Sequence, residues 1–295
     1  MLMFDRTALA ALSAVLDTGS FEAAAAKLHV SQSAISQRIK RLEDQTGAIL
    51  IRRTRPATAT EAGQRLQAHA ETLALLERDV THAMGGVATP LDRPLRIAVT
   101  ADTLASWVLP ALPREAHLFY DLVIDDQDHT AELLARGEVA AAITARKTAL
   151  TGCDVTPLKP LRYAAFAAPG FVAAHFSNGV TAKALADAPA LTFNRKDRLQ
   201  LHWAGKVAGH AIATLPTHYV PSTHGITEAA RAGLGWAVNP LPLVQPLFES
   251  GALVRLRPDI VLDTALYWQV PRQNKTALKG LTASLLRSAK AAHRP

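Results

Sequence analysis

The sequence comprises 295 residues, of which 49% are hydrophobic and 19% are charged, and its formal net charge is +7. Since one domain typically takes roughly 100–200 residues, we expect at least two domains with sizeable cores. The positive charge favours a polyanionic partner, and the single cysteine, Cys153, excludes an internal disulfide framework and is typical of a reducing compartment.

The N-terminal stretch MLMFDRTALAALSAVL lacks the basic leader of a secretory signal. No uninterrupted apolar run approaches the ~20 residues that a membrane-spanning helix needs. We therefore expect a cytoplasmic protein that has no membrane segment.

The chain begins with three short predicted helices. Asp5 is placed to cap the first of them. Ser20 precedes a helix-forming run at residues 21–28, and Ser31 precedes another, so both serines can accept hydrogen bonds from the free N–H groups of a helix start. Only residues 29–30 separate the last two helices, which must cross steeply, as in a helix-turn-helix.

The last of these helices separates a buried stripe from an exposed one. Its apolar residues Ala34, Ile35, Ile39 and Leu42 recur at helical spacing, and Gly47 is a natural end. The opposite stripe has short hydroxyl and amide side chains and one lysine. Such side chains can form hydrogen bonds with the edges of DNA bases in a major groove. The predicted DNA-contacting residues of this helix are Ser31, Gln32, Ser33, Ser36, Gln37 and Lys40.

A basic hairpin is predicted directly after this helix. Residues 49–51 predict a short strand, and Arg52, Arg53 and Arg55 follow in an exposed turn. Such a hairpin is the wing of a winged helix-turn-helix, which contacts phosphates or the minor groove. Two short helices with a tight turn also occur in many proteins that bind no DNA. The local excess of basic residues over the acidic residues 43–44 favours DNA binding.

Thr60 and Glu61 open a long predicted helix that reaches about Met84. Its apolar positions recur at spacings of four and three, which is typical of helices that pair across a dimer. This seam comprises Ala62, Leu66, His69, Leu73, Leu76, Val80 and Ala83. The alternative is a helix that packs on its own domain. His69 is the polar exception, which either reaches solvent or pairs with its symmetry mate. Residues 85–94 predict a hinge.

Beyond the hinge the pattern changes to alternating strands and helices, which predicts parallel sheets with helices on both faces. The first set comprises strands at 95–99, 118–124 and 139–144 and helices at about 103–113 and 130–136. The second set comprises strands at 164–168, 190–193 and 236–239 and a helix at 226–232. We expect a last strand at 265–269 and a helix from Lys275 onward to return to the first set.

Open parallel sheets bind ligands beyond the carboxyl ends of their strands. In the first set this rule points to the loop of Thr100, Ala101, Asp102 and Thr103, where free N–H groups at a helix start favour a carboxylate such as that of an amino acid. Asp102 either caps that helix or binds an α-ammonium group. A further candidate is the loop that follows Thr144.

The remaining loop of the first set is acidic and contains Asp126, Gln127 and Asp128. Clustered carboxylates repel one another unless a cation compensates them, and a lysine or arginine side chain would do so. The alternative is a helix cap with solvated neighbours, since charge clusters in loops are usually solvated. From the second set, Asn194 and the turn with Thr223 and His224 could close over the ligand.

Other kinds of site have no support in the sequence. It contains no Walker A loop, HExxH, CxxC or GxSxG motif. His218 and His224 lack the partners that a metal site needs. The sequence contains no recognisable catalytic pair of a nucleophile and a general base. We therefore expect neither an enzyme nor a bound metal or cofactor.

The first sixty residues resemble the LysR-type transcriptional regulators. The resemblance lies in SFEAAAAKLHVSQSAISQRIKRLE, followed by GAILIRR and TEAG. Downstream, the stretches ADTLASW, DDQDHTAELL, TFNRKDRLQ, VPSTHGITEAARAGLGW and LYWQ are similar to one branch of that family, the ArgP or LysG regulators of basic amino-acid export.

The resemblance implies a winged helix-turn-helix domain at 1–60, a dimerisation linker helix and hinge at 61–93, and an effector-binding domain at 94–295. That domain would have the two lobes of the periplasmic-binding-protein fold, with lobe I at about 94–162 and 265–295 and lobe II at about 163–264. The implied partners are an operator in double-stranded DNA, a small-molecule effector and RNA polymerase. The effector would be lysine, arginine or both, the target an exporter gene, and the assembly a homodimer or homotetramer on the nucleoid. The alternatives are a LysR-type regulator of another pathway with a different effector, or a small-molecule binding or transport protein of the periplasmic-binding fold.

Overall fold

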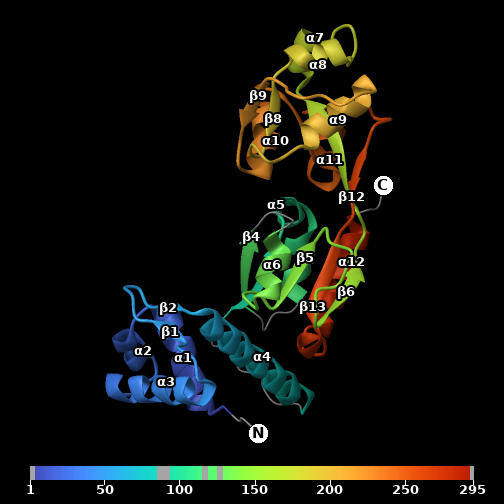
Figure 1. Cartoon of the computed structure of the whole chain (residues 1–295). Coiled ribbons are helices and arrows are strands. Elements are labelled where there is room, and N and C mark those ends of the chain that lie inside the picture. Colours follow the sequence, from blue (N-terminus) through green and yellow to red (C-terminus); the bar gives the residue numbers. More distant parts are fainter. Residues whose placement is uncertain (1–3, 85–93, 115–118, 125–128, 293–295) are drawn as a thin grey trace.

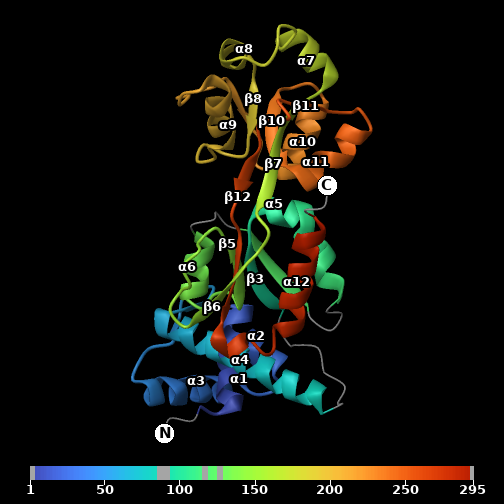
Figure 2. The same ribbon diagram turned by 90° about the vertical axis from the view of Figure 1, so that its right-hand side faces the viewer.

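The computed structural model describes residues 4–84, 94–114, 119–124 and 129–292. A helical N-terminal domain, a long helix and two helix-covered sheets succeed one another along the chain (Figure 1). In both views the first sheet lies between the N-terminal domain and the second sheet (Figure 2). The predicted architecture is therefore confirmed. Among the described residues, no helix combines the length and the apolar character that a membrane crossing requires.

Side-chain caps fix the starts of the three N-terminal helices, α1 (Arg6–Thr18), α2 (Phe21–Lys27) and α3 (Gln32–Thr46). The side chains of Asp5, Ser20 and Ser31 accept hydrogen bonds from the first turns of these helices, as predicted. The helices share one core, whose fully buried side chains include Leu12, Val15, Ile35, Ile39, Leu42 and Leu50. Ile35, Ile39 and Leu42 of the predicted buried stripe thus face this core, Ala34 is only partly buried, and the opposite stripe remains outside the core.

The wing is a two-stranded antiparallel ribbon of β1 (Ile51–Arg52) and β2 (Thr58–Ala59). It begins two residues later than predicted, because Ile49 is 70% exposed and lies outside the ladder. Leu50 is instead buried, and its backbone N–H donates to the Glu43 carboxylate at 2.9 Å. This bond joins the wing to α3.

The long helix α4 (Glu61–Ala83) starts where Thr60 caps it, with the Gly63 N–H donating to the Thr60 hydroxyl at 3.1 Å. Its N-terminal half packs within the chain, since Leu66 is buried in the core of the N-terminal domain and Leu73 packs against it. His69 lies edge-on to the Phe4 ring. This half therefore follows the alternative of a helix packed on its own domain, and pairing across a dimer stays a prediction.

Lobe I contains a five-stranded sheet in the order β4-β3-β5-β13-β6. The strands are β3 (Leu95–Val99), β4 (Tyr120–Ile124), β5 (Ala141–Thr144), β6 (Cys153–Pro157) and β13 (Tyr267–Pro271). β3 runs parallel to β4 and β5, but β13 is antiparallel to both of its neighbours. The prediction of a purely parallel sheet was therefore wrong for β13, which enters directly from lobe II without a helical crossover.

Helices cover both faces of this sheet, as predicted. α6 (His129–Ala135) packs on the face of Ala98 and Ala142, and α12 (Lys279–Ala291) packs with Trp107 on the other. The predicted helix at 103–113 is replaced by a short α5 (Ala101–Thr103), a π-helical turn (Leu104–Val108) and a 3₁₀ segment (Leu109–Arg114). Prolines within the last segment lack the N–H that a regular α-helix needs.

Lobe II contains a sheet in the order β11-β7-β10-β8-β9, and β12 also pairs with β7. The strands are β7 (Leu161–Ala167), β8 (Ala190–Thr192), β9 (Thr217–Tyr219), β10 (Trp236–Pro240), β11 (Val254–Leu256) and β12 (Leu262–Thr264). β8 is parallel to β9 and β10, whereas β7 is antiparallel to its three partners. Here too, parallel pairing was predicted for the whole sheet and holds only in part.

Five described helices cover the sheet of lobe II. They are α7 (Pro169–His175), α8 (Ala182–Asp187), α9 (Leu199–Ala208), α10 (Thr223–Arg231) and α11 (Leu241–Glu249). α10 and α11 pack on one face around Phe166, and α8 and α9 pack on the other around Trp203 and Trp236. The chain crosses between the lobes before β7 and after β12, where the Leu158 N–H donates to the Leu266 carbonyl at 2.9 Å.

Candidate functional site

The outer face of α3 presents the residues predicted to contact DNA. Gln32, Ser33, Gln37 and Lys40 are exposed, and Ser36 is partly exposed. The Ser31 hydroxyl is exposed too, but it already accepts from the Ala34 N–H at 3.2 Å and lies 2.9 Å from the Ser33 hydroxyl. Short polar side chains on a helix whose opposite face is buried can approach base edges without moving the core.

The three wing arginines, Arg52, Arg53 and Arg55, are all exposed. The Arg53 guanidinium lies over the ring of Phe21, 5.1 Å from its centroid, so it is held beside the start of α2. Nearby, the Glu43 carboxylate accepts the Leu50 N–H, so this acidic side chain serves the fold. The basic side chains therefore dominate the exposed surface of the wing, as phosphate contact requires.

A cleft of about 740 Å³ lies between the two lobes. Lobe I contributes residues at the carboxyl ends of β3 and β4, and lobe II contributes the loop after β8 together with residues of β7 and β10. Of the residues predicted to bind a ligand, Thr100, Ala101, Asp102 and Asn194 line this cleft. The strand-end rule thus leads to the part of lobe I that lines the cleft.

Asp102 is the central polar group of the cleft. One carboxylate oxygen accepts from the Tyr163 hydroxyl at 2.8 Å and the other from the Thr223 hydroxyl at 2.9 Å. Since Asp102 belongs to lobe I and both hydroxyls to lobe II, these bonds join the lobes. Thr100, and not Asp102, caps α5, because its hydroxyl accepts from the Thr103 N–H.

Burial raises the pKa of the Asp102 carboxyl above its ordinary value, and the bonds from Tyr163 and Thr223 oppose this rise. The negative charge of Asp197 raises the pKa of Asp102 further. Burial also raises the pKa of the Tyr163 phenol well above its ordinary value, and the charge of Asp102 adds to that effect. Among the described residues, only neutral hydroxyls donate to this partly buried carboxylate, and a cation would stabilise it.

Other predicted ligand residues lie behind or beside the cleft. Thr103 is buried and bonds with Thr100, and Thr223 touches the site through Asp102. Thr144 is buried at the end of β5, where its hydroxyl accepts from the Arg146 N–H and the Gln269 amide, so it serves to order the loop that follows. His224 is exposed on α10, outside the lining of the cleft.

The acidic loop of lobe I, with Asp126, Gln127 and Asp128, lies outside the described residues. Its position relative to a ligand therefore stays a prediction. The last described residue before it, Ile124, lines the cleft.

Sequence reasoning missed the charged loop of lobe II. Lys196, Asp197 and Arg198 line the cleft beside Asn194, whose side-chain oxygen accepts from the N–H groups of residues 196 and 197 at 2.8 and 3.1 Å. The Asp197 carboxylate accepts from the backbone N–H groups of Phe193 and Leu199. The loop follows β8, so the same strand-end rule could have found it.

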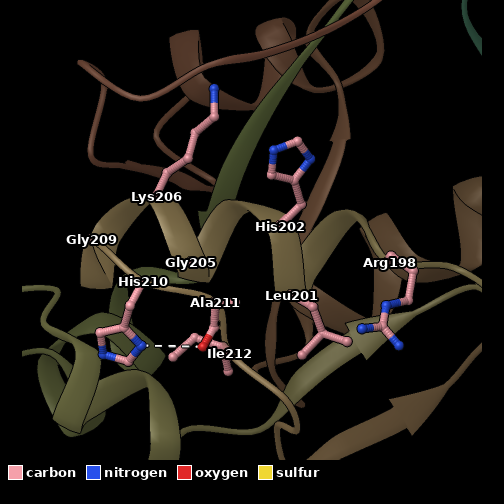
Figure 3. Close-up of a pocket in the computed structure, with 9 residues that line it drawn as sticks. All are labelled: Arg198, Leu201, His202, Gly205, Lys206, Gly209, His210, Ala211 and Ile212. Atoms are coloured by element: carbon pink, nitrogen blue, oxygen red, sulfur yellow. Dashed lines mark hydrogen bonds between the residues drawn. The ribbon is translucent and has the colours of Figure 1, made fainter.

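A second groove of about 570 Å³ runs along α9 and the segment that follows it, and it shares Arg198 and His202 with the cleft. His202 and Lys206 rise from one side of the helix, and the His210 ring lies beyond its end, 3.2 Å from the Ala211 carbonyl (Figure 3). No ligand residue predicted from the sequence lines this groove. Across the described ranges, no group of His, Cys, Asp and Glu side chains could hold a metal ion.

Two family descriptions match the chain. Residues 7–64 match the bacterial regulatory helix-turn-helix protein, lysR family, and residues 88–290 match the LysR substrate binding domain. A curated relative, the HTH-type transcriptional regulator LysG of Mycobacterium tuberculosis, is 43% identical over 290 residues, which cover 98% of this chain and 95% of the relative.

Two solved structures are similar over the whole chain. The crystal structure of ArgP from Mycobacterium tuberculosis shares 42% identity with a TM-score of 0.83, and 99% of each chain is covered. Full-length LysG from Corynebacterium glutamicum with bound effector Arg shares 35% identity with a TM-score of 0.73, and the match covers 99% of this chain and 100% of that one.

Proposed function

The chain belongs to the LysR family of transcriptional regulators, in its ArgP/LysG group, and from this premise we propose that L-lysine or L-arginine is its effector. Proteins of this family regulate transcription and are not enzymes. The effector enters the cleft between the lobes, and its binding changes the affinity for the operator or the bend of the DNA. The regulated gene encodes an exporter of basic amino acids.

The observation that best supports an effector with a cationic group, such as an amino acid, is the partly buried carboxylate of Asp102 in the cleft. In the part of the chain that the structure describes, two hydroxyls donate to it and no cationic side chain pairs with it, and the charge of Asp197 acts on it from lobe II. A ligand with a positive charge would stabilise the ionised carboxylate. The arginine bound to the similar LysG structure supports a basic amino acid among such effectors.

On DNA, Gln32, Ser33, Ser36 and Gln37 touch base edges in the major groove, and Ser31 and Lys40 lie beside them. Arg52, Arg53 and Arg55 bind phosphate or the minor groove. The helix α4 pairs two copies, so the operator has two half-sites related by symmetry. The protein acts on the nucleoid in the cytoplasm, where RNA polymerase is a further partner, and it uses no cofactor besides the effector.

Thermal unfolding of the full-length protein against a panel of amino acids tests this proposal. The panel contains L-lysine, L-arginine, L-glutamate and neutral controls. A ligand that binds the native state raises the unfolding midpoint as its concentration increases. At a concentration one hundred times its Kd, it adds about 2.7 kcal/mol to the free energy of unfolding. We expect a rise with lysine or arginine only.

The same ligands are then added to the protein on labelled DNA from upstream of a basic amino-acid exporter gene, with an unrelated fragment as control. Fluorescence anisotropy should show specific binding that the effector changes. If glutamate or a neutral amino acid raised the unfolding midpoint and neither lysine nor arginine did, the regulator would have a different effector.

A further inference from the structure

The lobe II side of the cleft places both signs of charge on adjacent residues. Asp197 lies between two cationic residues in the sequence, and all three residues line the cleft. An α-amino acid likewise places an ammonium and a carboxylate on one carbon atom, so their partners must be neighbours. Among the described residues that line the cleft, acidic and basic residues are neighbours in the sequence only in this loop.

The two carboxylates of the cleft are held in place from different lobes. Backbone N–H groups of Phe193 and Leu199 donate to Asp197 at 3.3 and 2.9 Å, and the hydroxyls of lobe II donate to Asp102. Neither carboxylate forms an ion pair with any residue that the structure describes. Each retains lone pairs that can accept a further hydrogen bond.

We propose that Asp197 and Asp102 together bind the α-ammonium group of the effector, while Arg198 binds its α-carboxylate. This inference rests on the proposed function, because it assumes an amino-acid effector in the cleft. An ammonium group has three N–H donors and no acceptor, so it can bridge two carboxylates and relieve their repulsion. The guanidinium of arginine suits a carboxylate because it can donate two parallel hydrogen bonds.

This arrangement explains how one cleft can accept both lysine and arginine. The two effectors share the α-ammonium and α-carboxylate groups and differ in the side chain alone. The loop after β8 would hold the shared part, and selection for a basic side chain would take place elsewhere in the cleft. The ammonium would also add a contact between the lobes, since Asp102 and Asp197 lie on different ones.

Isothermal titration of the full-length protein with three ligands tests the assignment. L-Lysine has both α-groups, 6-aminohexanoate lacks the α-ammonium, and cadaverine lacks the α-carboxylate. The variants are Asp197→Asn and Arg198→Gln, with Asp187→Asn as the control, because Asp187 is an exposed acid of lobe II outside the cleft.

In Asp197→Asn we expect lysine to bind about tenfold or more weakly, as for the loss of a charge-assisted hydrogen bond. Binding of 6-aminohexanoate should change less than about twofold, since it has no group for Asp197 to hold. In Arg198→Gln the affinity for lysine should fall by a similar factor, and the affinity for cadaverine should not fall. Asp187→Asn should bind all three ligands as the wild type does.

Equal weakening of lysine and 6-aminohexanoate in Asp197→Asn would overturn the inference, as would unchanged lysine affinity, and both results would leave the proposed effector intact. Wild-type protein that binds neither lysine nor arginine would overturn the proposed effector together with this inference. If Asp197→Asn fails to fold because the loop loses its anchor, Arg198→Gln decides, since the Arg198 side chain is exposed.

Discussion

Asp102 can be replaced in two ways that separate its hydrogen bonds from its charge. In Asp102→Ala, the hydroxyls of Tyr163 and Thr223 lose an acceptor at 2.8 and 2.9 Å. These residues are 1% and 4% exposed, so water reaches them poorly. A buried polar group without a partner costs about 1–3 kcal/mol. The two hydroxyls together should therefore lower the free energy of unfolding by about 2 kcal/mol or more.

In Asp102→Asn the side-chain oxygen can accept from one hydroxyl, and its NH₂ group can donate to the oxygen of the other. The hydrogen bonds are then kept and the charge is lost. Burial raises the pKa of Asp102 above its ordinary value of 3.8. Between pH 3.8 and the raised pKa, the folded state therefore binds more protons than the unfolded state. Stability therefore falls as pH rises through this window, by about 1.4 kcal/mol for each unit of pKa difference.

Thermal unfolding of the full-length wild type and both variants, at pH 7 and in acid steps down to pH 3.8, the lower end of this window, measures these effects. For a domain of this size 1 kcal/mol corresponds to about 2–4 °C in the midpoint. We expect Asp102→Ala to unfold about 4 °C or more below the wild type at pH 7. Asp102→Asn should unfold at or above the wild type, and its advantage should shrink as the pH falls.

An Asp102→Asn variant as unstable as Asp102→Ala would contradict this prediction, because the hydrogen bonds would then require the charge. A difference in midpoint between Asp102→Asn and the wild type that does not depend on pH would contradict it as well. Since the proposed effector needs the charge, Asp102→Asn should in addition lose the rise in midpoint with lysine.

Three further substitutions test the DNA-binding domain. Gly63→Ala places a Cβ 2.0 Å from the Leu50 carbonyl oxygen, so α4 and the wing must move apart. This overpacking should cost about 1–3 kcal/mol, lower the unfolding midpoint and weaken DNA binding. An unchanged midpoint would show that the two elements separate freely. Gln32→Ala should relax the preference at one base pair by about 1–3 kcal/mol, measured with singly substituted operators, and equal losses on all of them would contradict base contact. Arg53→Ala should weaken binding to all sequences alike and flatten the dependence of log K on log salt by about 1. A change in the preferred sequence would mean that Arg53 reads bases.

The N-terminal domain could be predicted closely because its signals are local. Asp5, Ser20 and Ser31 each cap a helix that begins at the next residue, so the sequence near each cap contains the whole instruction. The exposed face of α3 followed from the same periodicity. The wing was displaced by two residues, because the bond from the Leu50 N–H to Glu43 depends on how α3 is placed.

The lobes were predicted less completely because their pairing is not local. β13 has the apolar composition of a parallel core strand, and nothing in its sequence shows that it enters the sheet in the opposite direction. The same holds for the cleft. Tyr163 and Thr223 lie 61 and 121 residues from Asp102, and no spacing rule connects hydroxyls to a carboxylate at such separations. Asp197 was within reach of the strand-end rule, which could have been applied to lobe II as well.

The position of β13 also affects the order in which the lobes can form during synthesis. β13 lies between β5 and β6 in the sheet of lobe I, yet it follows all of lobe II in the chain. As the polypeptide leaves the ribosome, the sheet of lobe II is complete by residue 264, whereas the sheet of lobe I still lacks an inner strand. We expect lobe II to fold first, although lobe I is started first. During that interval β5 exposes an unpaired edge and β6 lacks its strand partner, and unpaired strands of this kind are bound by chaperones and are prone to aggregation.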